Sequence, residues 1–314
     1  MALDGECVVN TLKMVPSIIS SLATPQVSVP PNPLPGCCTD SVLKVVADNT
    51  GLATNNDVST VIWWFNSTTT AASIVMYKWL NGGWVSQGTI SDNTYGTYGA
   101  FGYYTNSEGQ NFISLQVAWA NVLSVKGAGS YKFVCSWTDS IVGNGSATSY
   151  EFCLYPYSNL IVDGTIRLEY WLSGTTEDIE NDQLIKDYGT LSIYNTLRVN
   201  GFFGYPERNY ETDNIQYNNG QYVWVEDYKK PIYTCKLLLL PEWLHTIIAT
   251  DFMMADTRAI TDYNSKNNGA YVTKYVMKES GYSPKYYPLQ ANNASVELKF
   301  SPQYNRSRKF MPTT

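Results

Sequence analysis

Between residues 37 and 160 the chain contains a series of short segments, each rich in β-branched and aromatic residues. Such segments, when separated by turn signals, predict strands; they are STVIWWFNST, SIVMYKWL, GWVSQGTI, NFISLQVAW, GSYKFVCSW and SYEFCLYPY. The clearest connection is YKWLNGGWVSQ, where Asn81-Gly82 suits the two positive φ angles of a type I′ turn. The pattern predicts an immunoglobulin-like antiparallel β-sandwich over residues 37–160.

A second hairpin in this region, GSYKFVCSWTDSIVGNGSATSYEFCLYPYS, permits a prediction of strand register. If its turn is centred on Asn144, Cys135 lies directly opposite Cys153. Both side chains then point to the same face of the sheet, because successive side chains alternate along a strand. We therefore expect Cys135 and Cys153 to be cross-strand neighbours, present as free thiols in a core.

From residue 161 onward the pattern predicts a second β-rich domain, 161–314, of the α+β type. Its clearest hairpin is IQYNNGQYVWVED, which turns at Asn219-Gly220. A helix is expected over about 241–256, where Pro241 suits the first helical position and Glu242 complements the helix dipole. The apolar face that should pack on a sheet consists of Trp243, Leu244, Ile247, Ile248, Phe252, Met254 and Ala255.

The two ends of the chain have their own character. Residues 1–36 form an arm that ends in VSVPPNPLPG, including Pro30 and Pro31, and such a proline-rich segment follows an extended path. This arm is either a plain linker or a segment that reaches over a neighbouring subunit. The tail NRSRKFMPTT, with Arg306 and Arg308, is basic and is either a frayed end or a docking peptide.

Composition excludes several classes of function. Only 15% of the residues are charged and the net charge is −6, so the chain is a poor electrostatic partner for nucleic acid. The sequence contains no run of 18 apolar residues, so no membrane span is predicted. The six cysteines contain no C-x-x-C pair, and His245 is the one histidine, inside an apolar segment. We therefore expect no catalytic, cofactor-binding or metal-binding residues, and a structural role for His245.

The sequence also contains candidate residues for cation binding and for the binding or cleavage of sugars. The acidic connector with Glu177, Asp178, Glu180 and Asp182 lacks the glycine and the spacing of a calcium-binding loop, which favours a solvated connector. A glycan-cleaving enzyme needs a pair of carboxylates, and the available ones are Glu207, Glu211, Asp213 and Glu226. A carbohydrate- or receptor-binding module is the stronger alternative, on account of Trp63, Trp64, Trp79 and Trp84 in the predicted sandwich.

The stretch SDNTYGTYGAFGYYTN is the densest group of tyrosines in the chain. Gly96, Gly99 and Gly102 recur every three residues, which predicts a turn-rich crossing where the backbone approaches another group closely. The stretch is either wall material of the sandwich or a contact between subunits that lines no isolated pocket. The candidate subunit-contact residues are Tyr95, Tyr98, Phe101, Tyr103 and Tyr104.

The chain resembles virion structural proteins of tailed bacteriophages, in particular tail, collar or ring components of phages of Bacteroidota, including the crAss-like group. The resemblance lies in the tyrosine-, asparagine- and glycine-rich segment YKWLNGGWVSQGTISDNTYGTYGAFGYYTN, the cysteine-bearing proline-rich arm, and NGFFGYPERNYETDNIQYNNGQYVWVEDYKKPIYTCKLLLLPEWLHTIIATDFMMAD. It implies a virion protein, assembled in the host bacterial cytoplasm, that forms a six-fold or twelve-fold homo-oligomeric ring against other virion proteins. It also implies no catalysis, no membrane and no sequence-specific nucleic acid.

Overall fold

The computed structural model describes residues 42–48, 56–65, 69–90, 98–105, 111–139, 143–172, 175–176, 186–187, 191–264, 273–286, 293–302 and 306–309. Strands dominate, and one main helical segment packs on a sheet, so the predicted β-rich α+β fold is confirmed. The predicted N-terminal arm with Pro30 and Pro31, and the contact candidate Tyr95, lie outside the described residues.

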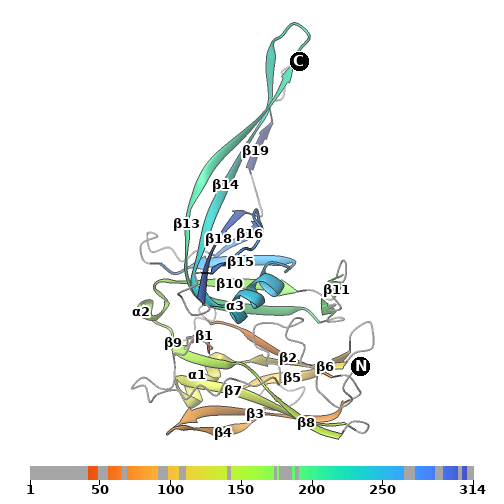
Figure 1. The fold of residues 1–314 in the computed structure, drawn as a ribbon, viewed down its shortest axis with the longest axis vertical. Coiled ribbons are helices and arrows are strands. Elements are labelled where there is room, and N and C mark those ends of the chain that lie inside the picture. Colours follow the sequence, from red (N-terminus) through yellow and green to blue (C-terminus); the bar gives the residue numbers. More distant parts are fainter. Residues whose placement is uncertain are drawn as a thin grey trace.

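The lower part of the molecule in Figure 1 contains two sheets. The larger has the strand order β1-β9-β7-β3-β4, with β8 also on β7. Its strands are β1 (Val42–Ala47), β3 (Thr69–Leu80), β4 (Gly83–Ile90), β7 (Gly129–Asp139), β8 (Gly143–Thr148) and β9 (Glu151–Pro156). The smaller has the order β2-β6-β5, with β2 (Ser59–Phe65), β5 (Gly99–Thr105) and β6 (Asn111–Val117).

The predicted hairpin at Asn81-Gly82 is present and joins β3 to β4. β3 and β4 pair so that Trp79 faces Trp84, and Asn81 and Gly82 at the tip have φ angles of 52° and 85°. Both values are positive, as a type I′ turn demands. The pairing of β1 with β9 is parallel, so the expectation of a purely antiparallel sandwich is wrong at this edge.

The predicted register of the cysteine hairpin is also wrong. Cys135 faces Ala147, and Cys153 faces Ser130. The turn is centred nearer to residue 141 than to Asn144, and one extra residue follows Ser149, whose backbone N–H still bonds to Phe133. An extra residue reverses the facing of every later side chain. Cys135 lies in the core and is a free thiol, whereas Cys153 lies on the other face of the sheet and is disulfide-bonded, so the expectation of two free thiols is wrong for Cys153.

The upper sheet in Figure 1 has eight strands in the order β17-β18-β16-β15-β10-β13-β14-β19, and β18 also pairs with β14. These strands are β10 (Thr165–Leu172), β13 (Ile193–Gln216), β14 (Tyr222–Pro241), β15 (Thr257–Asp262), β16 (Thr273–Lys278), β17 (Lys285–Tyr286), β18 (Asn293–Pro302) and β19 (Arg306–Lys309). The remaining short elements are α1 (Trp119–Lys126), α2 (Asn159–Val162), β11 (Thr175–Thr176) and β12 (Lys186–Asp187).

The predicted helix covers one face of this sheet. It runs as α3 (Glu242–Ile247) and continues as a short π-helical turn, η3 (Ile248–Phe252), so it ends before the expected residue 256. Pro241 occupies the cap position, one residue before the first helical residue. The expected apolar face is buried except for Trp243, which is half-buried against the core, and Met254, which is exposed beyond the last helical residue.

Sandwich and upper sheet are joined by buried polar contacts as well as by one continuous apolar core. Arg198 on β13 donates from Nε and Nη2 to the two carboxylate oxygens of Asp57, each at 2.8 Å, and both side chains are almost fully buried. Beside this pair, the Asn195 side chain accepts from the backbone N–H of Thr60 at 2.8 Å. The start of β13 is therefore held against the strand β2 and the residues just before it.

Candidate functional site

The most distinctive feature of the molecule is a hairpin of β13 and β14 that projects from the body, which is called the arm below (residues 206–233) (Figure 1). Its strands pair continuously from Pro206 opposite Tyr233 to Gln216 opposite Tyr222, with one irregularity at Asp213. Eleven residues at about 3.4 Å each give a length of about 35 Å. Such a projection exposes both faces of a sheet and therefore offers a large surface to a partner.

One edge of the arm is covered by the C-terminal part of the chain. β18 pairs with β14 as far as Tyr233, and β19 then pairs with Glu226–Lys229. Arg308 lies opposite Asp227, and Arg306 opposite Lys229, so the part of the basic tail that the structure describes, Arg306–Lys309, is the third strand of the arm. The structure thus places both predicted contact arginines on the arm.

The end of the arm, called the tip below, is residues 214–225 and contains no charged residue. The chain reverses between Tyr217 and Gln221, where the Tyr217 N–H donates to the Gln221 carbonyl and the Gly220 N–H to the Tyr217 carbonyl. Gly220 has a φ of 83°, as the last position of a three-residue hairpin loop requires. The predicted turn at Asn219-Gly220 is confirmed, and residues 216–221 are all exposed.

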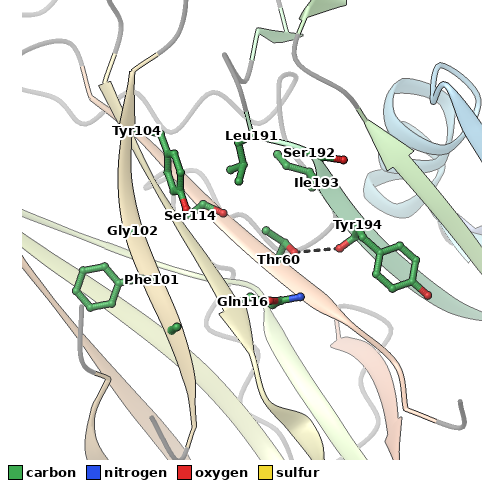
Figure 2. A pocket seen from close by; sticks show the side chains of 11 residues that line it. Thr60, Phe101, Gly102, Tyr104, Ser114, Gln116, Leu191, Ser192, Ile193 and Tyr194 are labelled. Atoms are coloured by element: carbon green, nitrogen blue, oxygen red, sulfur yellow. Dashed lines mark hydrogen bonds between the residues drawn. The ribbon is translucent and has the colours of Figure 1, made fainter. Parts of the chain in front are cut away.

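A cavity of about 350 Å³ lies on the outer face of the three-stranded sheet, toward the start of β13 (Figure 2). It exists because three residues of β5 and β6 that point to this face are small: Ala100, Gly102 and Ser114. The other lining residues are Thr60, Phe101, Tyr104, Gln116, Leu191, Ser192, Ile193 and Tyr194. None of them is a carboxylate, imidazole, thiol or amine, so the cavity offers hydrogen bonds and apolar contact.

Hydrogen bonding fixes one wall of the cavity. The Thr60 hydroxyl donates to the Tyr194 carbonyl at 3.0 Å, which joins β2 to the start of β13. The rings of Phe101 and Tyr194 are turned away from the hollow in Figure 2. The Tyr194 hydroxyl instead donates to Glu169 at 2.9 Å, and burial together with this carboxylate raises the pKa of Tyr194.

The predicted aromatic contact residues behave differently from one another. Phe101 is 3% exposed and belongs to the sandwich core, so it is not a surface contact. Tyr98 and Tyr104 are half-buried against the core, and Tyr104 stacks on Phe112. Tyr103 is exposed, and its hydroxyl accepts from the Ala72 N–H at 2.8 Å. The expectation that this stretch lines no pocket is wrong, because four of its residues line the cavity.

Gly99 and Gly102 lie in a regular strand rather than in a turn-rich crossing, and Gly96 lies outside the described residues. Gly99 has a φ of 141°, and a Cβ there would collide with the Gln116 carbonyl oxygen. The close backbone approach expected for it is therefore present. A Cβ at Gly102 would lie 2.9 Å from the hydroxyl oxygen of Tyr104, which is too close. In the sequence Ala-Phe-Gly-Tyr, 100–103, small and aromatic residues alternate. This alternation is the signal that one face of the strand lines the cavity and the other faces the core.

Trp171, the described tryptophan beside Tyr194, does not offer an open platform for a sugar. Trp171 stacks on Tyr194 at 4.7 Å between ring centroids and lies 6.1 Å from Tyr275 on the other side. Both faces of the indole are therefore occupied by neighbouring rings. Of the tryptophans proposed for sugar binding, Trp63 is fully buried, while Trp79 and Trp84 contact each other edge to face at 5.3 Å.

The carboxylates that a glycan-cleaving enzyme would need are spread along the arm. Glu207, Glu211, Asp213 and Glu226 occupy its two strands, and only Asp213 and Glu226 lie opposite each other. The acidic connector with Glu177, Asp178, Glu180 and Asp182 lies outside the described residues. Within the described ranges, no group of three or more potential ligands is placed to hold a metal ion. None of the helices described is long and apolar enough to cross a membrane.

His245 on α3 is held in one tautomer by two hydrogen bonds. Its Nε2–H donates to the Ala294 carbonyl at 3.0 Å, so Nδ1 accepts from the Tyr282 hydroxyl at 2.6 Å. Burial lowers the pKa of His245, although the carbonyls of Ala294 and Leu240 partly oppose this. The neutral ring connects the helix to β18, which agrees with a structural role.

Lowering the pH should destabilise the protein through this residue. The unfolded chain takes up a proton at His245 near the ordinary pKa of 6.5, whereas the folded chain resists it. The contribution of His245 to stability is therefore complete above pH 6.5 and is lost as the pH falls toward the folded-state pKa. In urea unfolding from about pH 7.5 to about pH 5, we expect a steeper loss for wild type than for His245→Gln.

The single histidine also makes a direct measurement possible, because its ring protons give one NMR titration. Tyr282→Phe is the matched control: it removes a donor to the neutral ring, so the measured pKa should rise. A wild-type pKa above 6.5 would contradict the assigned tautomer and burial.

Neither the protein-family models nor the curated proteins match this chain at a significant level. The arm and the cavity therefore carry the functional argument. Sequence reasoning identified the turn of the arm but missed the projection of its strands and the cavity.

Proposed function

We propose that this chain is a structural assembly protein of a phage virion, forming part of a homo-oligomeric ring or tube in the tail or neck. The arm is the observation that carries this proposal. Beyond β19 the arm has two described strands, and a two-stranded hairpin is only marginally stable alone in water, so this end of the arm is best explained by a partner that covers it. The assembly is built from copies of the same chain and stacks on other virion proteins, without catalysis.

Composition supports a surface made for permanent contacts. The chain has 25 tyrosines and only 15% charged residues. Tyrosine is enriched at interfaces, where charged residues are depleted. The exposed aromatic and aliphatic side chains of the described residues include Tyr103, Tyr217, Tyr275, Leu160 and Leu239. The tail or neck location, the cyclic order of six or twelve, and the virion itself come from the resemblance.

The test is the association state of the purified full-length chain. Mass photometry and sedimentation across a concentration series should show a discrete oligomer, and electron microscopy class averages should show cyclic symmetry. The matched variant lacks the tip: residues 214–225 are replaced by Asn-Gly, so that Asp213 still faces Glu226 across a two-residue turn. A wild-type chain that is strictly monomeric at every concentration would refute the proposal.

A carbohydrate- or receptor-binding module is the second candidate, and the uncharged, hydrogen-bonding cavity is the observation in its favour. A glycan array with the wild-type chain tests it. Binding should then be lost when a charge is introduced by Gln116→Glu.

A further inference from the structure

The tip of the arm is chemically unlike the rest of the arm. Its twelve residues, NIQYNNGQYVWV, are uncharged and include two tyrosines and a tryptophan. Charged residues begin immediately outside it, with Asp213 on one strand and Glu226 on the other. Tyr217 is 56% exposed, and within the described residues these positions pair only with each other. An uncharged aromatic end on a charged stalk is suited to desolvation by a partner.

The long edge of β13 is a less suitable contact, although no described strand pairs with it beyond Gly201. Pro206 lies within this segment and has no N–H to donate. Glu207, Arg208 and Glu211 follow it. Proline and charged residues on an edge strand prevent pairing with another chain. The contact chemistry is therefore concentrated at the tip.

The cavity has the complementary character. It opens to solvent on the body, and its described lining residues include no charged one although the chain as a whole carries a net charge of −6. Ser114, Gln116 and Ser192 offer hydrogen-bonding groups, and Tyr104 and Leu191 offer apolar surface (Figure 2). Asparagine, glutamine and tyrosine side chains of the tip find suitable partners on such a surface, and a charged segment does not.

The tip cannot reach the cavity of its own molecule. It lies at the far end of the arm, whereas the cavity lies in the body between the three-stranded sheet and the root of β13 (Figure 1). β19 pairs with the arm as far as Glu226 and stiffens it. The start of β13, which leads into the arm, is fixed by the Arg198–Asp57 pair. Any contact between the two surfaces therefore joins different molecules.

We propose that the tip of one copy of this chain docks in the cavity of the next copy. This inference rests on the proposed function and names its subunit contact. The contact uses two different surfaces, so it is heterologous: a bound pair still presents one free tip and one free cavity. Repetition closes a ring if the rotation between subunits permits and otherwise gives a filament.

A complementation experiment tests this contact with two full-length variants. One lacks the tip, with Asn-Gly in place of residues 214–225, and keeps the cavity. The other keeps the tip and carries Gln116→Glu and Ser192→Glu, which place charges in the cavity from two exposed positions. Gln87→Glu on β4 is the matched control, since it makes the same change away from the cavity.

Each defective variant should be unable to form large assemblies, with self-association weakened about tenfold or more, because a charge would be buried without a partner. Mixed together, they should form a one-to-one heterodimer and nothing larger, since only one tip and one cavity are functional. Gln87→Glu should assemble like wild type. Circular dichroism and the urea midpoint of each variant show that it is folded.

Three results would overturn the proposal. If wild type assembles but the mixture gives no heterodimer, the subunits join elsewhere, and the proposed assembly function stands without this contact. If wild type never assembles, both proposals fail together. If wild type binds a glycan that competes with assembly and is lost with Gln116→Glu, the cavity belongs to a sugar and not to the tip.

Discussion

Replacing Asp57 with asparagine should lower the free energy of unfolding by about 3–5 kcal/mol, the usual cost of breaking a buried ion pair from one side. The side chains of Arg198 and Asp57 are 0% and 2% exposed, so water cannot solvate the guanidinium that remains. Asparagine has nearly the same shape and can still accept from the Val46 N–H, which Asp57 does at 2.8 Å. The loss therefore reports on charge and not on volume.

The surroundings increase this cost. Arg167 and Glu169 form a second buried pair at 2.8 Å, and the Tyr263 ring lies 4.5 Å from the Arg198 guanidinium carbon and 5.8 Å from that of Arg167. The described network thus balances two cations against two carboxylates. Removing one carboxylate leaves an excess positive charge in the interior, where the pKa of arginine is too high for the group to become neutral.

Urea unfolding followed by tryptophan fluorescence measures the effect. The double variant Asp57→Asn with Arg198→Met has no unpaired charge at this site and should lose less stability than Asp57→Asn alone. Glu297→Gln is the matched control, because Lys236 and Glu297 form a half-exposed pair at 3.2 Å whose loss should cost at most about 1 kcal/mol. Equal losses for Asp57→Asn and Glu297→Gln would contradict the buried pair.

The elements that could be predicted from the sequence are those fixed by neighbouring residues. Asn81-Gly82 and Asn219-Gly220 turn where expected, because the positive φ values of Asn81, Gly82 and Gly220 depend on residue type and not on distant contacts. The helix begins beside Pro241 for a similar reason, since its start signals lie within one turn. Its early end after Phe252 was not visible, because the apolar spacing continues to Ala255.

Strand register was not predictable in the cysteine hairpin. There the Ser149 hydroxyl accepts from the Phe133 N–H at 2.9 Å and donates to the Tyr150 carbonyl at 2.8 Å. These bonds accompany the extra residue that turns Cys153 away from the core. A bulge of this kind depends on the partner strand, and the local sequence pattern does not predict it.

The candidate site was predictable only in part. The cavity draws its lining from β2, β5, β6 and residues 191–194, which are far apart in sequence. Thr60 and Tyr194 meet only because the two sheets join there. The strands of the arm were recognised, but a strand pattern does not show where the body ends and the projection begins. Asp57 likewise lies in a polar segment, NNDVST, that gives no sign of burial.

Trp119→Ala should lower the free energy of unfolding by about 3–5 kcal/mol, as large-to-small changes of buried tryptophans do. Trp119 is the first residue of α1 and is 1% exposed. Its ring lies 5.8 Å from Phe133 on β7 and 5.1 Å from Phe152 on β9, while its Nε1–H donates to Ser59 on β2 at 2.9 Å. One side chain thus joins the two sheets of the sandwich, and alanine would leave a cavity at their junction.

Two further variants separate packing from hydrogen bonding at this junction. Ser59→Ala keeps the ring but leaves the indole N–H buried without its acceptor, which should cost about 1–3 kcal/mol. Trp84→Ala is the matched control on β4, where the half-buried ring contacts Trp79 and Lys132 at an edge and should cost less than Trp119→Ala. Unfolding in urea, followed by the remaining tryptophans, compares all three. If Trp84→Ala were as damaging as Trp119→Ala, the sandwich would not be centred on α1.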